Sequence, residues 1–426
     1  MEKRNEYSWD WDTLVVGAGA AGCMAAIAAA GQGQHVLLLE KNEKIGKKLY
    51  LTGKGRCNLT NLADTSEILE NIPTNAKFLY GALHALSSHQ LMAFFEQAGC
   101  PLKAERGGRV FSRSDKSSDI LKTLEKQLSI GGVTVRKKEI VRELMMAENA
   151  EERRVVGVRL SSGESILAGR VILAAGGLAY PATGSTGDGY RLAAQAGHSM
   201  EETVPGLVPL ETAERDFAAA APLLLKNIGF RLVEGKKLLF SGQGEIQFTP
   251  FGLGGALALS ASSYLPKRPA AVKGVIDLKP ALSPEMLEDR LVRELAAQPD
   301  QAVETAWASL LPHKLLLLFF QRCGLAAEKP AAQISKKERQ AMAAGLKGLE
   351  FEIKGTRDFT EAIITRGGVR VKEINPKTME SKLVKGLYLV GEMIDVDALT
   401  GGFNLQIAFS TGYLAGIQPC PDKEKK

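Results

Sequence analysis

Short apolar segments alternate with helical patterns at both ends of the chain. Near the N-terminus, Thr13 to Val16 and Val36 to Leu39 predict buried strands, and the small residues from Cys23 to Ala30 predict a helix between them. Near the C-terminus, Leu387 to Val390 predicts a further buried strand, and a helix follows from about Asn404. Strands that alternate with helices favour an α/β fold built on a parallel sheet.

The middle of the chain has the pattern of β structure. Gly132 to Leu144 and Val155 to Gly177 together predict three or four strands. The last of these strands, Val171 to Ala174, is fully apolar and breaks at Gly176 and Gly177. Such a break is typical of a buried strand whose end lies beside a bound ligand.

Residues 201 to 278 contain strand-like segments. From about residue 279 onward, the pattern becomes helical. Ser283 is typical of an N-cap and Pro284 of a first helical position, and a leucine stripe follows. Ser335 to Glu338, "SKKE", has the pattern of a capping box at the start of another helix. The run "KLLLLFFQRCG" between them is compatible with a buried helix and equally with a core strand. The stripe consists of Leu287, Leu291 and Leu295.

Length and composition describe a globular protein of more than one domain. The chain has 426 residues, 45% of them hydrophobic and 24% charged, and its net charge of +6 is spread along the sequence. So diffuse a charge does not indicate a nucleic-acid partner, and no window of about 18 uninterrupted apolar residues predicts a membrane span. The five cysteines lack C-x-x-C spacing, so we expect no disulfide framework, no bound metal and a reducing, cytoplasmic location.

The turn between the first strand and the first helix carries the clearest chemical signal. It reads "GAGAAG", a G-x-G-x-x-G sequence whose glycines permit a tight turn, close approach of a pyrophosphate, and close packing of helix on strand. Glu40, at the end of the second strand, is placed to accept hydrogen bonds from both ribose hydroxyls of an adenosine. A glycine-rich helix start without a ligand is the alternative, but the complete strand, turn, helix, strand and acid predict a bound dinucleotide. The predicted contacts are Gly17, Gly19, Ala20, Ala21, Gly22 and Glu40.

The segment after Glu40 indicates which dinucleotide is bound. A basic loop punctuated by glycines, "EKNEKIGKKLYLTGKGRCNLTN", stands where a simple NAD dehydrogenase would continue with its next strand and helix. Flavin adenine dinucleotide (FAD) is long and lies extended, so a protein that binds it needs extra loop to cover the pyrophosphate and reach the isoalloxazine. A solvated surface loop is the alternative, which the mixture of glycines with Arg and Asn disfavours. The candidate contacts are Lys41, Lys48, Thr52, Gly53, Gly55, Arg56, Cys57 and Asn58.

Later strand ends supply the other candidate contacts. Glu392 follows the last apolar strand and can accept a ribityl hydroxyl, and the glycine pair before the last helix can direct backbone N–H groups at the flavin. The polar stretch "YPATGSTGDGYRLAAQAGH" is expected to line the active site. We therefore expect the end of the chain to close the cofactor site that its beginning opens. The candidates are Val141, Ala175, Gly176, Gly177, Thr186, Gly391, Glu392, Gly401, Gly402, Asn404 and Leu405.

Four stretches resemble a known family. They are "TGKGRCNLTN", "GGRVFSRSDKSSDIL", "AGGLAYPATGSTGDGYRLAAQAGH" and "TRGGVRVKEINPKTMESKLVKGLYLVGEMIDVDALTGGFNLQIAFSTGYLAG". Together they are similar to the BaiN/RdsA family of NAD(P)/FAD-dependent oxidoreductases, which includes aminoacetone oxidase-like flavoproteins. The resemblance covers nearly the whole chain.

This resemblance implies a Rossmann-like FAD-binding domain of the glutathione-reductase type, interrupted by a β-rich domain that is itself interrupted by a small helical domain. The implied boundaries are 1–200 and 357–426 for the FAD-binding domain, 201–278 and 344–356 for the β-rich domain, and 279–343 for the helical domain. The FAD would be bound non-covalently.

Few side chains stand out as candidates for acid–base or thiol chemistry. Pro250 occupies a position where the family typically has the histidine of "FTHxGxSGPA", so any chemistry of that histidine would be absent here. Cys57 is either a thiol packed beneath the flavin ring or part of a disulfide reductase, and the lack of a second cysteine a few residues away favours the first. His198 is expected to be structural, and the other four histidines fall outside every motif. We assign no catalytic residue, because the flavin itself carries hydride chemistry.

The leading functional hypothesis is an FAD-dependent oxidoreductase in which flavin N5 takes a hydride from NAD(P)H and passes it to a small organic acceptor such as an activated alkene. One alternative is an oxidase that transfers electrons from a small amine to oxygen. Another is an FAD-containing protein that binds or modifies RNA, for which the diffuse charge offers no basic face. The substrate and the oligomeric state stay open.

Only one complete dinucleotide fingerprint is present, and FAD occupies it in this interpretation. A nicotinamide donor would then bind transiently over the flavin, in a cleft between the FAD-binding and β-rich domains, with groups such as Arg56, Arg113 and Lys116. The competing hypothesis places a dedicated nicotinamide domain in residues 201 to 356.

Overall fold

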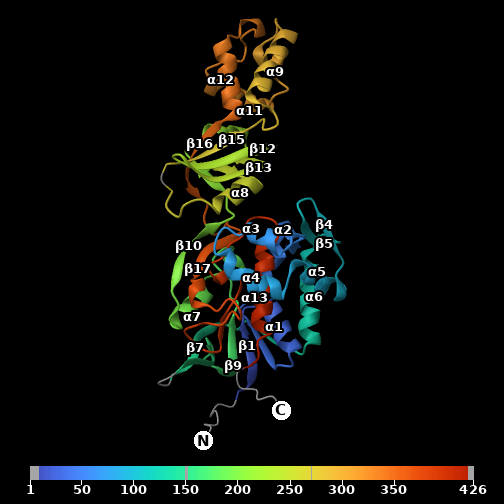
Figure 1. Ribbon diagram of the computed structural model, residues 1–426, viewed down its shortest axis with the longest axis vertical. Coiled ribbons are helices and arrows are strands. Elements are labelled where there is room, and N and C mark those ends of the chain that lie inside the picture. Colours follow the sequence, from blue (N-terminus) through green and yellow to red (C-terminus); the bar gives the residue numbers. More distant parts are fainter. Residues whose placement is uncertain (1–8, 149–151, 270, 421–426) are drawn as a thin grey trace. The chain divides into compact units, whose positions relative to one another are not determined.

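The computed structural model describes residues 9–148, 152–269 and 271–420. The chain forms two compact units, Met1–Gly206 with Phe359–Lys426 and Leu207–Asp358 (Figure 1). The first unit contains both ends of the chain, as the sequence pattern predicts for the parts that share the dinucleotide motif.

A seven-stranded sheet forms the centre of the first unit (Figure 1). Five of its strands run parallel, and two antiparallel strands extend one edge. The inner parallel strands are almost completely buried, as is usual where both faces of a parallel sheet are covered. The strand order is β6 (Thr134–Lys137), β2 (Val36–Glu40), β1 (Trp11–Val16), β9 (Ser165–Leu173), β8 (Arg153–Leu160) and β7 (Val141–Glu148), with β18 (Leu387–Leu389) also paired to β9.

Two helices from opposite ends of the chain pack directly against each other. They are α1 (Ala20–Gly31) and α13 (Phe403–Gly416). A Cβ added to Gly412 would lie 2.2 Å from Ala21 O, and one added to Gly416 would lie 2.5 Å from Ala25 O. The small residues of both helices therefore allow their backbones to touch, and this contact brings the C-terminal helix onto the dinucleotide motif.

Smaller elements of the first unit surround this core. They are α2 (Lys47–Gly55), β3 (Thr60–Asn61), α3 (Thr65–Glu70), α4 (Tyr80–Ala85), α5 (Ser88–Gln97), β4 (Leu102–Glu105), β5 (Arg109–Ser112), α6 (Ser117–Ile130), α7 (Asp188–Gln195), β10 (Met200–Gly206), β17 (Ile364–Val369) and the 3₁₀ turn η6 (Gly391–Met393). Strands β3, β5 and β4 form a small sheet, and β10 pairs with β17.

A buried arginine links the central sheet to the end of α13. Arg170 lies in β9 with 0% of its surface exposed. Its guanidinium donates to Thr13 Oγ1 at 2.6 Å, to Gln34 Oε1 at 2.9 Å, and to the carbonyl oxygens of Ala415 and Gly416 at 2.8 Å each. The last carbonyls of a helix carry partial negative charge, so they compensate a buried cation that forms no ion pair with any described residue.

The second unit combines a closed barrel with four helices. The helices follow β15 and precede β16, and one hydrophobic core contains residues of both the barrel and the helices. The barrel order is β11 (Leu210–Thr212), β14 (Gly252–Gly254), β13 (Lys237–Thr249), β12 (Leu223–Glu234), β15 (Val272–Asp277) and β16 (Leu349–Thr356), and α8 (Gly255–Ser262) packs on β13. The four helices are α9 (Pro284–Ala297), α10 (Val303–Ala306), α11 (His313–Cys323) and α12 (Lys336–Lys347).

The helix signals of the second unit are confirmed. Ser283 caps α9 by accepting from Met286 N at 3.2 Å, and Ser335 and Glu338 form a capping box at the start of α12. The predicted leucine stripe of α9 is buried. The ambiguous run "KLLLLFFQRCG" is helical and forms most of α11.

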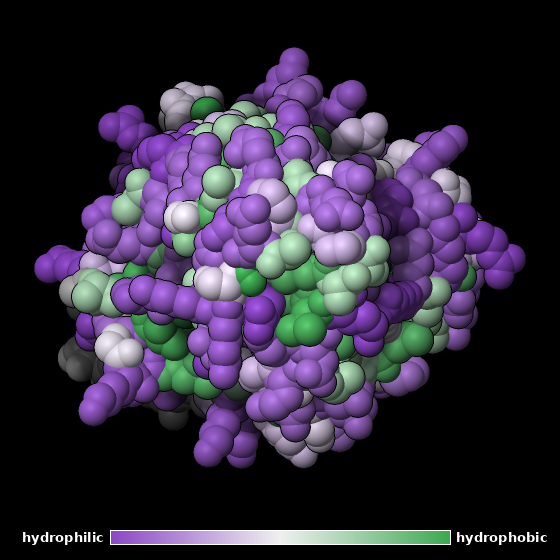
Figure 2. Space-filling view, turned by 90° about the horizontal axis from the view of Figure 1, so that it is seen from above, coloured by the Kyte–Doolittle hydropathy of each residue, from purple (hydrophilic) through white to green (hydrophobic). Residues whose placement is uncertain are grey.

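Hydrophobic residues reach the surface of the helical end in separate small areas between hydrophilic side chains (Figure 2). Met286 and Val292 of α9, for example, are 55% and 43% exposed. Within the described residues, no helix is both long enough and apolar enough to cross a membrane.

The buried arginine generates a stability prediction. The substitution Arg170→Met leaves two helix-end carbonyls and two side-chain oxygens without their hydrogen-bond donor. We therefore expect the free energy of unfolding of the variant to be lower than that of the wild type by at least about 3 kcal/mol. Chemical denaturation of purified protein measures this loss. The matched control is Arg159→Met in the neighbouring strand, where Arg159 is 48% exposed and paired with Glu143, and where the cost should stay below about 1 kcal/mol. Equal losses in the two variants would contradict a special role for Arg170.

Candidate functional site

The glycines of the "GAGAAG" turn serve different purposes. Gly17 has φ of 99°, and a Cβ there would lie 2.6 Å from Ala174 O. A Cβ on Gly22 would lie 1.8 Å from Gly17 O, so neither position accepts a side chain. Gly19 has an ordinary extended backbone, and a Cβ there would meet no atom within 4 Å. Only the middle glycine faces open space, which fits a position kept bare for a ligand that approaches the start of α1.

Glu40 is attached to this turn. Its Oε2 accepts from Ala18 N at 2.8 Å, and its Oε1 accepts from Asn42 N at 2.8 Å and Asn42 Nδ2 at 2.7 Å. A carboxylate offers about four acceptor positions, so these three bonds leave Oε2 able to accept from a ribose hydroxyl. Glu40 forms no ion pair with any described residue, which leaves its charge available to a ligand. Its contact with both hydroxyls stays a prediction.

The stretch from Pro181 to Asp188 lies against the end of β2. Lys41 Nζ donates to Thr186 Oγ1 at 2.6 Å and pairs with Asp188 Oδ2 at 2.5 Å. Asn42 Nδ2 donates to Thr183 O at 3.1 Å. The polar stretch predicted to line the active site therefore lies next to Glu40, the residue predicted to bind the ribose.

The loop expected after Glu40 is partly helical. Residues Lys47–Gly55 form α2, and only its second half departs from helical geometry, at Thr52, Gly53 and Lys54. The prediction of a continuous loop is therefore wrong for the first half. The departure has a local cause: Gly53, Lys54 and Gly55 all have positive φ, at 58°, 58° and 81°, which a helix cannot accommodate.

An ion pair connects α2 with the end of the last strand. Lys48 Nζ lies 2.8 Å from Glu392 Oε1 and 2.6 Å from Oε2, and Thr365 N also donates to Oε1 at 2.8 Å. Gly391 has φ of 73°, and a Cβ added there would lie 2.9 Å from Ala21 Cβ, which is too close for two carbon atoms. The end of β18 therefore lies against the first turn of α1, so the beginning and end of the chain meet as predicted.

The start of α13 is held by the segment "NLTN". A Cβ on Gly402 would lie 2.3 Å from Thr60 O, and in its satisfied orientation the Asn58 amide bridges Thr60 O at 3.2 Å and Gly402 N at 3.0 Å. Asn61 Nδ2 donates to Gly401 O at 3.0 Å. The side-chain amide of Asn404 accepts a hydrogen bond from Ala398 N and donates one to Ala398 O, which closes the turn before α13. Leu405 packs against the hydrophobic core.

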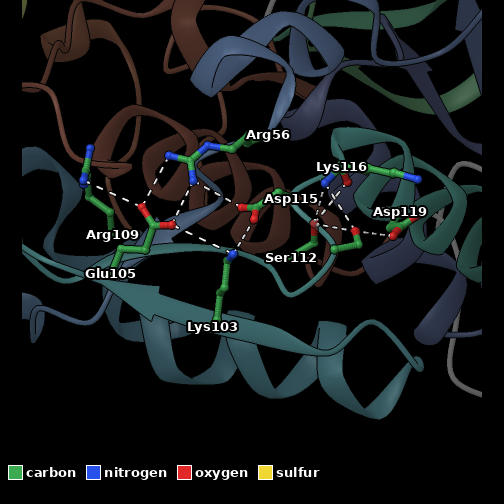
Figure 3. A network of polar contacts seen from close by, with 9 residues as sticks. Arg56, Lys103, Glu105, Arg109, Ser112, Asp115, Lys116 and Asp119 are labelled. Carbon is green, nitrogen blue, oxygen red and sulfur yellow. Dashed lines mark hydrogen bonds and ion pairs between the residues drawn. The ribbon is translucent and has the colours of Figure 1, made fainter.

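Arg56 has two carboxylate partners. Its Nη1 lies 2.8 Å from Glu105 Oε1 and 3.2 Å from Asp115 Oδ1, and its guanidinium lies 4.1 Å from the centre of the Phe111 ring (Figure 3). The hydrogen bond from Arg56 holds the pKa of Glu105 below its usual range, and Lys103 does the same for Asp115. Arg56 is therefore compensated by two carboxylates, and its contact with FAD or with a nicotinamide donor stays a prediction.

Cys57 fits the interpretation of a packed thiol. It is fully buried, and burial raises the pKa of its thiol to about 12, so it carries little thiolate at neutral pH. Cys57 and Cys100 are both free.

The remaining candidates lie at the sheet. Ala175, Gly176 and Gly177 directly follow β9, and Gly177 lies so close to Thr365 that a Cβ would be 2.4 Å from its Oγ1. Val141 begins β7, and its carbonyl accepts from Arg191 at 2.9 Å.

Thr365 was not among the sequence candidates. Its hydroxyl accepts from Leu178 N at 2.7 Å and Ala179 N at 3.1 Å, while its amide bonds Glu392. Thr365 therefore joins two strand ends of the site. Its position at the start of the "TRGGV" motif was the signal that could have identified it.

His198 is a structural residue, in agreement with the sequence analysis. Its Nδ1 lies 3.0 Å from Glu373 Oε2, and its Nε2 lies 2.8 Å from Ser381 Oγ. Ser381 Oγ also accepts from Leu383 N and Val384 N at 3.0 Å each, so its hydroxyl hydrogen points to the imidazole. This hydrogen-bond pattern requires a neutral His198 whose Nε2 accepts a hydrogen bond from the Ser381 hydroxyl.

With the geometry described, comparison with known proteins decides the family. The HI0933-like protein Rossmann domain matches residues 11–418. The chain belongs to this family. Membership confirms the family resemblance, the Rossmann-like fold and the class of FAD-dependent oxidoreductase predicted from the sequence.

Relatives in this family carry two different names. The chain is 33% identical over 408 residues to the 3-dehydro-bile acid delta(4,6)-reductase of Clostridium scindens, covering 94% of this chain and 97% of that protein. It is 29% identical over 407 residues to the ribosomal RNA dihydrouridine synthase of Haemophilus influenzae, covering 95% and 98%. Among solved structures, 3-ketosteroid-Δ4-(5α)-dehydrogenase from Rhodococcus jostii RHA1 has a TM-score of 0.47 at 15% identity, with 97% of each chain covered.

The bare face of Gly19 gives a direct test of the dinucleotide site. Gly19→Val should fold normally, because the added side chain meets no protein atom, yet it should lose FAD because it fills the space of the pyrophosphate. Flavin absorbance per protein after purification measures the loss. Gly31→Val, at the other end of α1, where a Cβ also meets nothing within 4 Å, is the matched control and should retain FAD. Full FAD content in Gly19→Val would refute the assignment.

The buried histidine predicts a pH dependence of stability. Burial lowers the pKa of His198 below its ordinary value of about 6.5, so below that pH the unfolded chain binds the proton more readily. The free energy of unfolding should therefore fall as the pH decreases from about 6.5 towards the folded pKa, by up to about 1.4 kcal/mol per pH unit. Denaturation at several pH values measures this slope. It should flatten in His198→Asn and persist in the exposed control His84→Asn, and an unchanged slope in the first variant would contradict the prediction.

Proposed function

We propose that this chain reduces a carbon–carbon double bond conjugated to a carbonyl group in a small molecule, with a reduced nicotinamide dinucleotide as the electron donor. The observation that carries this proposal is the 33% identity to a bile acid reductase across 94% of the chain. The name of that relative describes reduction at the 4 and 6 double bonds of a steroid acid that carries a 3-oxo group.

The second group of relatives supports the same chemistry on another substrate. Dihydrouridine differs from uridine by a saturated C5–C6 bond, and that bond in uridine is conjugated to a ring carbonyl. The activities for which these relatives are named therefore share an acceptor: an alkene activated by a neighbouring carbonyl. The relatives at 33% and 29% identity share this reaction class but differ in substrate. The shared reaction class is therefore a better basis for proposing the function of this chain than either substrate alone.

The residues at the ends of the central strands fit FAD. The open face of Gly19 and the N-terminus of α1 would receive the pyrophosphate, and Glu40 would accept from the adenosine ribose. Lys48 and Glu392, which form an ion pair with each other, would contact neighbouring parts of the cofactor, the ammonium as a cation for phosphate and the carboxylate as an acceptor for ribityl hydroxyls. FAD bound there would accept a hydride at N5 and pass it to the alkene.

Pro250 limits which residues take part in proton transfer. It lies in the turn between β13 and β14, where Thr249 Oγ1 accepts from Gly252 N at 3.1 Å. Proline has neither a titratable side chain nor a backbone N–H, so this position supplies no proton. Any acid–base role of the histidine found there in typical family members must be absent or performed by another residue.

Ribosomal RNA is the second candidate substrate, because two relatives at 29% identity are named for it. The prediction that the chain has no nucleic-acid partner therefore stays a prediction. Parallel assays with a 3-oxo-Δ4 steroid acid and with an unmodified rRNA transcript distinguish the two substrate classes.

The experiment for the proposed function begins without oxygen. FAD-loaded protein is mixed with NADPH, NADH or small amines, and the loss of visible flavin absorbance is followed; the steroid enone or rRNA is then added to restore it. We expect reduction by a nicotinamide dinucleotide, with a KM well above the low-micromolar end of the usual span of about 1 μM to 1 mM, because no second Rossmann motif exists to bind it tightly. Gly19→Val protein is the flavin-free control.

Two outcomes would contradict this function. Reduction by an amine but by neither dinucleotide would indicate an oxidase. A tight NAD(P)H complex that survives removal of FAD would support a dedicated nicotinamide domain instead.

A further inference from the structure

A cavity of about 460 Å³ lies beside the network around Arg56. Its walls come from the turn between α5 and β4, the turn between β5 and α6, and one face of α6; Ser112 and Asp119, labelled in Figure 3, belong to it. Its volume falls within the range of about 300 to 1,000 Å³ that is typical of ligand and cofactor pockets. The lining residues are Gly99, Cys100, Pro101, Ser112, Arg113, Ser114, Asp119, Lys122 and Thr123.

The two cations of this cavity lack partners. Arg113 and Lys122 form no ion pair or side-chain hydrogen bond with any described residue. The cations next to the cavity differ: Arg56 pairs with Glu105 and Asp115, and Lys103 pairs with Asp115 (Figure 3). Two cations that line one cavity without an ion pair to any described residue present a positive potential to an anion.

The single carboxylate of the cavity is hydrogen-bonded within the cavity wall. Asp119 accepts from Ser114 Oγ at 2.5 Å, within the turn that leads into α6. The buried Ser112 donates to Lys116 O at 3.1 Å and accepts from Lys116 N at 3.2 Å, so this wall is rigidly built. An anion that enters the cavity would therefore meet the two positive charges of Arg113 and Lys122 against the one negative charge of Asp119.

The cavity is adjacent to the segment that we assign to the flavin. Ser112 ends β5, and β5 pairs with β3, which directly follows the "TGKGRC" segment. Phe111 of β5 lies 4.1 Å from Arg56, and its ring would be 3.5 Å from a Cβ on Gly53. A ligand anchored at Arg113 is thus separated from that segment by a single strand.

We infer that this cavity binds the 2′-phosphate of NADPH and makes NADPH the preferred donor. The inference rests on the proposed function, which requires a nicotinamide donor but assigns it no site. The 2′-phosphate is a dianion at neutral pH, and a guanidinium and an ammonium that line the same cavity can supply charge-assisted hydrogen bonds of the kind that bind phosphate most strongly. NADH has no such group and leaves both cations unpaired.

The test removes both cations in Arg113→Ala/Lys122→Ala. The expected result is a rise of roughly tenfold or more in KM for NADPH, with KM for NADH changed by less than about threefold, and with FAD content and kcat at saturating donor unchanged. Adenosine 2′,5′-bisphosphate should compete with NADPH in the wild type and lose this effect in the variant, whereas inorganic phosphate should compete only weakly. The matched control is Lys77→Ala/Arg106→Ala, which removes the same charge from exposed positions outside the cavity and should leave both KM values as they are.

The outcomes separate this inference from the proposed function. If neither dinucleotide reduces the wild-type flavin, the proposed function itself fails. If both dinucleotides reduce it and the double variant keeps the wild-type ratio of the two KM values, the donor function stands and the cavity assignment is refuted. An equal rise in both KM values would also refute it, because the effect would then not depend on the 2′-phosphate. A change only in the KM of rRNA would assign the cavity to an RNA phosphate and overturn the inference.

Discussion

The first unit depends on a buried arginine that joins three segments which are far apart in sequence. Arg170 bonds β1 through Thr13, the approach to β2 through Gln34, and the C-terminus of α13 through two carbonyls. A guanidinium inside an apolar core is tolerable only when its donors are satisfied, and here helix-end carbonyls with partial negative charge satisfy it. The C-terminal end of α13 is therefore fixed to the sheet at the end remote from the candidate site, and the small-residue contact with α1 fixes the rest of that helix.

This arrangement determines the geometry of the candidate site. With α13 fixed along α1, its N-terminus at Gly402 must meet Thr60, and the strand end at Gly391 must meet Ala21. Both approaches are too close for a side chain, which explains glycine at these positions on steric grounds. The candidate cofactor site is thus assembled from the two ends of the chain, and its precision follows from backbone packing more than from surface loops.

The sequence predicted those features that depend on local chemistry. The "GAGAAG" turn, the strand ending at Glu40, the N-cap of α9 and the capping box of α12 follow from residues close together in the chain, and the structure contains them. The sequence did not predict Arg170, because an arginine in an apolar strand has no local partner, or the partners of Arg56, which come from a distant hairpin. The first half of α2 was missed because glycines further along suggested a loop. Closure of the barrel depends on strand pairing between distant segments, and the division of the second unit into β-rich and helical domains stays a prediction.

Charge compensation distinguishes the two ligand positions that we propose. At the candidate FAD site, Lys48 pairs with Glu392 and Lys41 with Asp188, so these two cations are compensated without a ligand, and Glu40 is held by hydrogen bonds from Ala18 and Asn42. A resident cofactor can then be held mainly by shape, backbone N–H groups and the fixed glycine contacts, which do not require the charges to separate. At the cavity beside β5, Arg113 and Lys122 stay unpaired and exposed to water, where each ligand charge is strongly screened. Such a site attracts an anion rapidly and releases it readily, as a donor that must leave after each reduction requires.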